Sequence, residues 1–130
     1  MSKPDEHWHT RETYRSMIGF GQGMLRFTFL ANGAAIISIL TFLGDLNAKS
    51  VEVPNMKGAL AFFLAGVLLS GLATITTYVI QFMLYNETIN NIDAKGWGSH
   101  VRWLHATLVL VVLSMIAFAV GAFSAVSRLQ

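Results

Sequence analysis

Histidine and carboxylate side chains are the groups of this sequence that could bind a metal ion or transfer a proton. His7 and His9 flank Trp8, but on a helix residues i and i+2 point about 200° apart and cannot share an ion. His105 lies in an apolar segment, where a histidine could act as an axial haem ligand, yet no second histidine accompanies it there. The chain contains no cysteine. We therefore expect no metal, no cofactor and no disulfide.

The acidic residues do not form a catalytic pair. All of them lie outside the long apolar segments: Asp5, Glu6, Glu12, Asp45, Glu52, Glu87 and Asp93. A transporter or proton relay usually carries an ionisable residue within the membrane. The sequence GFGQG at 19–23 is not a nucleotide-binding loop, because no strand precedes it. We expect neither an enzyme nor a proton-coupled transporter.

Small and hydroxylated residues instead form a stripe on one helical face. They are Gly66, Ser70, Thr74, Thr77 and Gln81. Spacings of three and four residues put them on one side of a helix. Such a stripe can pack against a neighbouring helix of the same chain, with interhelical hydrogen bonds. It can also line a wet cavity or pore, and the sequence leaves both readings open.

Asn32 is a carboxamide within an almost wholly apolar segment. We measure depth from the nearest charged or loop residue on each helix, at about 1.5 Å per residue. On that measure Asn32, Thr77, Gln81 and His105 all fall within about 13 Å of the same membrane boundary. Each would be costly alone in hydrocarbon, but together they could satisfy one another. We predict a buried polar cluster centred on Asn32.

Two further groups of small residues predict close helix packing. Gly33 directly follows Asn32, and Ala117, Gly121 and Ala125 repeat every four residues in the last apolar segment. Small residues at this spacing let two helix backbones approach closely, whatever the partner helix is.

These residues have to be positioned by apolar helices. The 130-residue chain is 54% hydrophobic and 12% charged, and Phe27–Gly44, Gly58–Asn86 and Trp103–Ser127 contain no Lys, Arg, Asp or Glu. A helix needs about 20 apolar residues to cross a bilayer. We predict one all-α integral membrane domain, residues 1–130, with transmembrane helices at 26–44, 57–85 and 101–127.

The segment before the first span predicts an amphipathic helix at 5–25. Tyr14, Met17, Ile18, Gly21 and Leu25 recur at helical spacing. The polar face carries Arg11, Arg15, Gln22 and Arg26, which could contact lipid headgroups or a partner protein. Three glycines at 19, 21 and 23 predict a bend, because glycine lowers helix propensity.

The distribution of basic residues predicts the orientation. One side would hold Lys3, Arg11, Arg15, Arg26, Lys95 and Arg102, and the other Lys49, Lys57 and Arg128. The positive-inside rule then puts the N-terminus in the cytoplasm and the C-terminus outside. Trp97 and Trp103 fall on the inner side, where their rings suit the headgroup layer and could contact lipid or a partner. The first 23 residues lack the apolar stretch of a cleavable signal peptide. A net charge of +2 gives no reason to expect nucleic acid.

The stretch FLANGAAIISILTFLG, at 29–44, resembles the first span of small bacterial inner-membrane proteins that carry an LNGGAA-type sequence before an LLxFLG-like run. The resemblance covers about a fifth of the chain. It implies a bacterial inner-membrane location and brings no activity or catalytic residues. The Asn-Gly pair at 32–33 is retained, whereas Ala31 and Ala34 differ from the pattern.

A bundle this small has ridges of small residues that need partners, so we expect the chain to form a homo-oligomer. We predict the first of two functions and keep the second as the alternative. In the first, copies self-associate and alter membrane permeability as a channel or toxic effector, with the polar stripe facing the lumen. In the second, the chain is a non-catalytic accessory or anchor subunit that packs against a larger membrane partner. Hydration of the stripe separates them, because a lumen is wet and a packed interface is dry.

Overall fold

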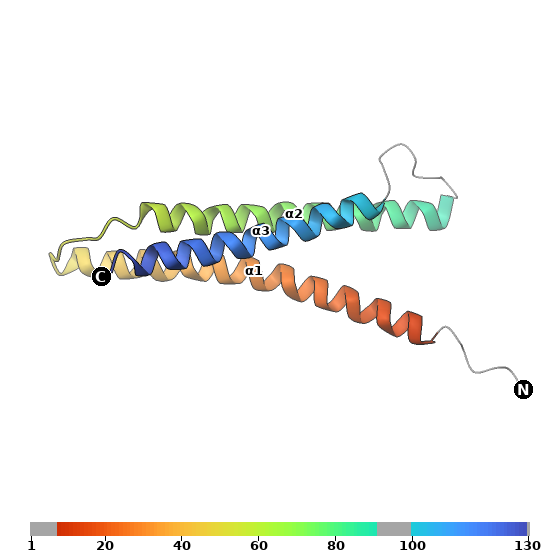
Figure 1. The fold of residues 1–130 in the computed structure, drawn as a ribbon, viewed down its shortest axis with the longest axis horizontal. Coiled ribbons are helices and arrows are strands. Elements are labelled where there is room, and N and C mark those ends of the chain that lie inside the picture. The colour runs from red at the N-terminus through yellow and green to blue at the C-terminus, as the bar shows by residue number, and fades with distance from the viewer. Residues whose placement is uncertain (1–7, 91–99, 130) are drawn as a thin grey trace, which may run out of the picture.

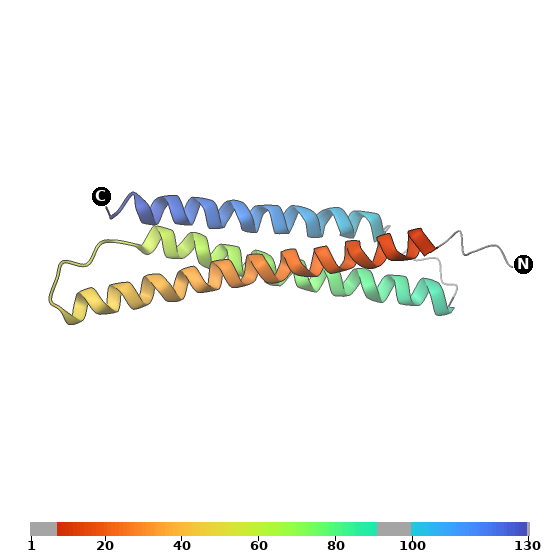
Figure 2. The ribbon, with the colours of Figure 1, turned by 90° about the horizontal axis from the view of Figure 1, so that it is seen from below.

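The computed structural model describes residues 8–90 and 100–129. They form three helices, α1 (Trp8–Ala48), α2 (Lys57–Asn90) and α3 (His100–Val126), and these ranges contain no strand. The helices lie side by side in one elongated bundle (Figure 1, Figure 2). All three are long and apolar enough to cross a membrane. The prediction of an all-helical chain with three such helices is confirmed.

The helices are longer than two of the predicted segments. α1 joins the described part of the lead-in at 5–25 and the span at 26–44 into one helix of 41 residues. The glycines at 19–23 do not break it, because glycine keeps the N–H that the helical hydrogen-bond ladder needs. α2 runs to Asn90, past the predicted end at 85. α3 begins and ends one residue earlier than predicted.

The C-terminal end of α1 is closed by a Schellman motif. The Ser50 N–H donates to the Asn47 carbonyl at 3.1 Å, and the Val51 N–H donates to the Leu46 carbonyl at 3.1 Å. This motif needs a left-handed residue at its turn, and Ser50 supplies it with φ at 54°. Glycine is the usual residue there, so the serine adopts a backbone conformation that its Cβ disfavours.

The N-terminal end of α2 is capped by an asparagine. The Asn55 side-chain oxygen accepts a hydrogen bond from the Lys57 N–H at 3.2 Å, and the first backbone bond of the helix runs from Leu60 to Met56. A capping side chain satisfies one of the N–H groups that a helix start leaves open. Pro54 precedes the cap and separates α2 from the turn after α1.

The bundle packs most closely between α2 and α3, and α1 contacts α2 more than it contacts α3. Phe63 of α2 stacks at a tilt on Phe118 of α3, with ring centroids 5.7 Å apart. A Cβ placed on Gly121 would approach the Phe63 ring to 3.0 Å. The absence of a side chain at Gly121 therefore lets the α2 phenylalanine lie against the α3 backbone. Towards its N-terminal end α1 diverges from the other two helices (Figure 1).

The strained cap at Ser50 gives a stability prediction. Ser50→Gly should stabilise the fold by about 1 kcal/mol, because glycine removes the left-handed penalty. The measurement is loss of helical circular dichroism during SDS titration from a mild detergent. Ser50→Ala is the control and should give no gain, because alanine keeps the Cβ. Equal stability of the two variants would contradict the role assigned to this turn.

Candidate functional site

Four buried polar side chains meet at the centre of the bundle. Thr28 and Asn32 come from α1, Ser70 from α2 and Ser114 from α3. Thr28 is 2% exposed and the other three are 0% exposed. We call these four residues the polar cluster. It joins all three helices at one level and is the candidate functional site.

Helical periodicity brings each member to the centre. Thr28 and Asn32 are four residues apart on α1 and so share one face. The buried face of α2 holds Phe63, Gly66, Ser70 and Ala73 at alternating spacings of three and four. On α3, the buried residues recur at spacings of three, three and four: Val111, Ser114, Ala117 and Gly121. Ser70 and Ser114 are therefore the polar members of two otherwise small or apolar faces.

Hydrogen bonds connect the three helices through this cluster. The Asn32 Nδ2 donates to the Ser114 Oγ at 3.3 Å and to the Thr28 carbonyl of its own helix at 2.8 Å. The Ser70 Oγ donates to the Thr28 Oγ1 at 2.9 Å. The Ser70 Oγ also lies 2.9 Å from the Ser114 Oγ, and the Ser114 Oγ donates to the Gly66 carbonyl at 2.9 Å.

Every proton of the cluster has an acceptor within the chain. The Thr28 hydroxyl donates to the carbonyls of Met24 and Leu25, both at 3.1 Å. With the Asn32, Ser70 and Ser114 bonds, this uses the two amide protons and the three hydroxyl protons. No donor is left for water or an anion. Chemically, the cluster fastens the three helices together, and because all four side chains are buried it offers no water-filled path to a permeating species.

The Asn32 Oδ1 is the one side-chain acceptor of the described residues that is buried without a hydrogen-bond donor. It lies against Gly66, where an added Cβ would overlap the carboxamide. The Gly66 backbone presents Cα–H groups there, which are weak donors to oxygen at close helix contacts. The opposite amide orientation would set the oxygen against the Thr28 carbonyl. The missing side chain at Gly66 therefore provides the space that the Asn32 carboxamide occupies.

The predicted polar stripe of α2 does not lie on one surface of the bundle. Gly66 and Ser70 are buried in the cluster, whereas Thr77 is half-buried and Thr74 and Gln81 are exposed. Thr74 and Thr77 donate to carbonyls of their own helix, at 2.9 Å and 2.8 Å. The predicted stripe continued from Ser70 to Thr74, but the next buried residue of α2 after Ser70 is Ala73. The stripe therefore does not form one lining within a single copy.

The predicted partners of Asn32 also need correction. Asn32 is at the centre of a buried polar cluster, but Gln81 and His105 are exposed and take no part in it. The His105 Nδ1 pairs with the Val101 carbonyl of its own helix at 2.7 Å. The prediction assumed that the last charged or loop residue of each helix lies at one level. The prediction failed because the helices extend by different lengths beyond the cluster. At ~1.5 Å per residue, α2 runs about 24 Å from Ser70 to Asn86, whereas on α1 Arg26 lies about 9 Å from Asn32.

The residues predicted for helix packing occupy different environments. Ala117 and Gly121 are buried, Gly121 against the Phe63 ring of α2, and Ala125 is half-buried. Gly33 is half-buried, and an added Cβ would meet nothing within 4 Å. The ridge on α3 is therefore used inside the chain, whereas Gly33 makes no close helix contact here.

The residues predicted to contact lipid or a partner are mostly exposed. Arg11, Arg15 and Arg26 are exposed on α1. Trp103 of α3 is half-buried, and its carbonyl accepts a hydrogen bond from the Thr107 Oγ1 at 3.0 Å. Trp97 lies outside the described residues.

Two members of the cluster were missed by sequence reasoning, together with one further link. Thr28 and Ser114 complete the cluster. A signal existed in each case: Thr28 is four residues before Asn32, and Ser114 interrupts an apolar run. A second bridge joins Thr76 of α2 to Thr107 of α3, with 2.7 Å between their hydroxyl oxygens.

Among the side chains that the structure describes, no three histidine or acidic groups lie close enough to hold a metal ion. No protein-family model, curated protein or solved structure matches this chain.

The contact between Asn32 and Gly66 gives a second prediction. Gly66→Ala should destabilise the bundle by about 1–3 kcal/mol, because the new methyl group displaces the carboxamide from a packed site. Gly71→Ala is the matched control on the same helix, where an added Cβ meets nothing within 4 Å. It should be neutral or stabilising by up to about 1 kcal/mol. SDS titration followed by circular dichroism measures both.

A double-mutant cycle separates this steric contact from a general loss of helix packing. In an Asn32→Ala background, the space left by the carboxamide accommodates the Gly66→Ala methyl group, so most of its cost should disappear. Additive effects of the two substitutions would contradict the close contact between Asn32 and Gly66.

Proposed function

We propose that the chain is a three-span protein of the bacterial inner membrane that serves as a non-catalytic accessory or anchor subunit. Its outer surface supports insertion into lipid. Large apolar side chains on all three helices, including Phe20, Leu40, Leu64 and Phe123, are more than half exposed. Water penalises such a surface by roughly 25 cal/mol per Å² of apolar area, whereas hydrocarbon does not.

The charged residues that flank the helices support one placement in the bilayer. Measured from the polar cluster at ~1.5 Å per residue, Asp45, Lys57 and Arg128 all lie about 20 Å away along their helices. On the opposite side, Arg26 lies about 9 Å from Asn32 by the same rise. For α1 the sum matches a hydrocarbon core of about 30 Å.

This placement creates a thick layer on the side of Arg26. The inner hydrocarbon boundary then falls near the bridge between Thr76 and Thr107, and Tyr78, Gln81 and His105 lie in the headgroup region. The excess of basic residues on this side supports a cytoplasmic N-terminus. The helices therefore offer a partner a layer of exposed side chains on the cytoplasmic side.

The observation that carries the proposal is the closed polar cluster. Its donors are used inside one chain, and its serines are fully buried. A membrane protein that permeates ions as a monomer needs polar groups facing a wet path. Here the polar groups hold three helices together, which is the property required of a small anchor.

A permeability function remains a second candidate because part of the predicted stripe is exposed. Thr74 and Gln81 are exposed on α2, and Tyr78 between them is 71% exposed. Copies that assemble around this face would line a path between subunits rather than within one. Self-association is a requirement of this candidate and not of the first.

Cysteine accessibility separates the two candidates, because the chain has no cysteine of its own. For an anchor subunit, Ser70→Cys and Thr74→Cys should both resist a water-soluble maleimide in intact membranes, since one is packed and the other faces lipid or protein. Ser127→Cys, in the exposed turn after α3, is the reactive control. Expression of the chain alone should leave the membrane potential unchanged in a voltage-sensitive dye assay.

Other outcomes would identify different functions. Labelling of Thr74→Cys together with depolarisation would favour an intersubunit path. Labelling of Ser70→Cys would contradict the closed cluster itself, because that position is buried among three helices.

A further inference from the structure

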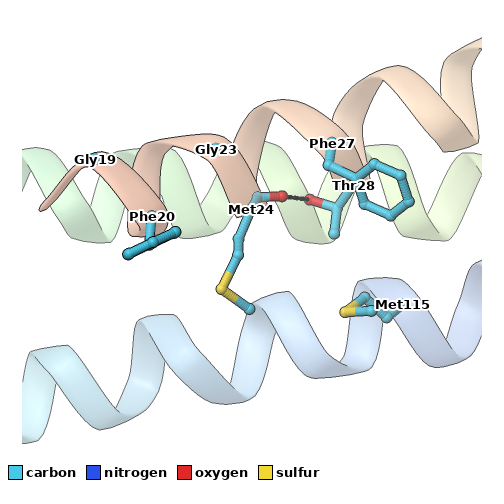
Figure 3. Close-up of a pocket in the computed structure, with 7 residues that line it drawn as sticks. All are labelled: Gly19, Phe20, Gly23, Met24, Phe27, Thr28 and Met115. Atoms are coloured by element: carbon cyan, nitrogen blue, oxygen red, sulfur yellow. Dashed lines mark hydrogen bonds between the residues drawn. The ribbon is translucent and has the colours of Figure 1, made fainter. Parts of the chain in front are cut away.

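An open apolar groove runs along the junction of α1 and α3. Gly19, Phe20, Gly23, Met24 and Phe27 of α1 and Met115 of α3 line a volume of about 310 Å³ (Figure 3). We call this the α1–α3 groove. Its deep end reaches Thr28, and a smaller hollow of about 40 Å³ continues beside Asn32 and Phe118. The groove therefore extends from the N-terminal half of α1 to the polar cluster.

Two features of α1 keep this groove open. Gly19 and Gly23 contribute no side chain, and a Cβ added to either would meet nothing within 4 Å. α1 also diverges from α2 and α3 along this half of its length (Figure 1). The space is thus produced by the backbone and is large enough to accept a chain of atoms rather than a single water.

The lining selects an apolar occupant. Thr28 is the polar residue among those that line the groove, and its hydroxyl already donates to Met24 and Leu25 and accepts from Ser70. A peptide or headgroup would find no free hydrogen-bonding group on these walls. The volume is many times the ~30 Å³ that a single water occupies in the liquid, so the groove has room for a run of methylene groups. A hydrocarbon chain satisfies both conditions.

The charges at the groove's edge select the headgroup. On a helix with 100° per residue, Arg26 lies about 60° round from Gly23, and Arg15 lies about 40° round from Gly19. Both arginines are exposed and border the glycine wall. Glu12 is the only carboxylate in the Trp8–Arg26 part of α1. This edge therefore complements an anion.

The opposite helix contributes a cation at a matching level. Arg102 precedes Met115 on α3 by about 20 Å, and Arg15 precedes Thr28 on α1 by the same length, at ~1.5 Å per residue. Arg102 is exposed. In the placement proposed above, Arg26 marks the inner hydrocarbon boundary. The outer part of the groove, from Gly19 to Met24, then lies in the headgroup layer with basic residues of both helices, and its inner part, at Thr28 and Met115, reaches the hydrocarbon.

We propose that the α1–α3 groove binds an anionic phospholipid, with its phosphate in the headgroup layer between Arg15 and Arg26 and one acyl chain entering the inner part of the groove. The inference rests on the membrane insertion proposed above, and it does not require a partner protein. The lipid would fill the opening between α1 and α3 and brace the part of α1 that the bundle leaves unsupported.

Native mass spectrometry of the full chain in mild detergent tests the proposal. The probes are phosphatidylglycerol and phosphatidylethanolamine with identical acyl chains, supplied at equal concentration. The wild type should retain one phosphatidylglycerol in preference to phosphatidylethanolamine. Gly23→Leu adds a side chain to the groove wall at a position where a Cβ meets nothing within 4 Å, and it should lower retention about tenfold, as expected for the loss of about two buried methylene groups. Gly19→Leu should act in the same way.

Matched variants distinguish binding of the acyl chain from recognition of the lipid headgroup. Gly33→Leu adds the same side chain to α1 at another open glycine, outside the groove, and should retain lipid like the wild type. Arg26→Gln should reduce the preference for phosphatidylglycerol about fivefold, the effect of one basic residue near a membrane surface. Arg128→Gln, beyond the far end of α3, should leave the preference unchanged.

Several outcomes would overturn the proposal. Equal retention by wild type, Gly23→Leu and Gly19→Leu would indicate unselective lipid around the bundle. Competition by water-soluble glycerol phosphate as strong as that by phosphatidylglycerol would show that the phosphate binds without the groove. A dimer that Gly23→Leu abolishes would assign the groove to a second copy. Extraction of the wild type from membranes by alkaline carbonate is a separate readout, and it would contradict the membrane insertion rather than the groove.

Discussion

The contact of the Asn32 carboxamide with Gly66 is the constraint on which the rest of the bundle depends. α1 has fewer contacts with its neighbours than α2 and α3 have with each other, and its buried polar groups all come from Thr28 and Asn32. The carboxamide fits only where α2 lacks a side chain. Its bond to Ser114 then ties α1 to α3 as well. One residue thereby sets the position of α1 relative to both other helices.

The polar cluster specifies the helix packing because all of its donors are paired at once, rather than because any single hydrogen bond is strong. Interhelical hydrogen bonds in membranes average about 0.6 kcal/mol, so the bonds of Ser70 and Ser114 contribute modestly one by one. A donor left unpaired in an apolar interior would cost more than a bond contributes. Because every cluster donor has an acceptor, one arrangement of the helices satisfies all of them together. A register shift of any helix would leave several donors unpaired, and this specifies the packing.

The same contact leaves the N-terminal half of α1 without support. Beyond Thr28, no residue nearer the N-terminus of α1 is buried in the described bundle, and Phe20 is 75% exposed. The helix persists there because its backbone hydrogen bonds are internal and its glycines keep their donors. Its exposed apolar and basic side chains suit the membrane insertion that we propose, because the headgroup layer of a bilayer offers both hydrocarbon and anions.

The sequence by itself determined the helical class, the three apolar helices and the presence of a buried polar group at Asn32, because these follow from hydropathy, helix length and the cost of an isolated carboxamide. Only the tertiary structure decided which side chains meet that carboxamide. Depth counted from charged residues selected Gln81 and His105, whereas packing selected Ser114, Thr28 and Gly66. Helix periodicity defines a face to within about one residue, so Thr74 and Ala73 were equally good continuations of the row from Ser70. The choice between them depends on the rotation and axial offset of neighbouring helices, and those are set by contacts between residues far apart in the sequence.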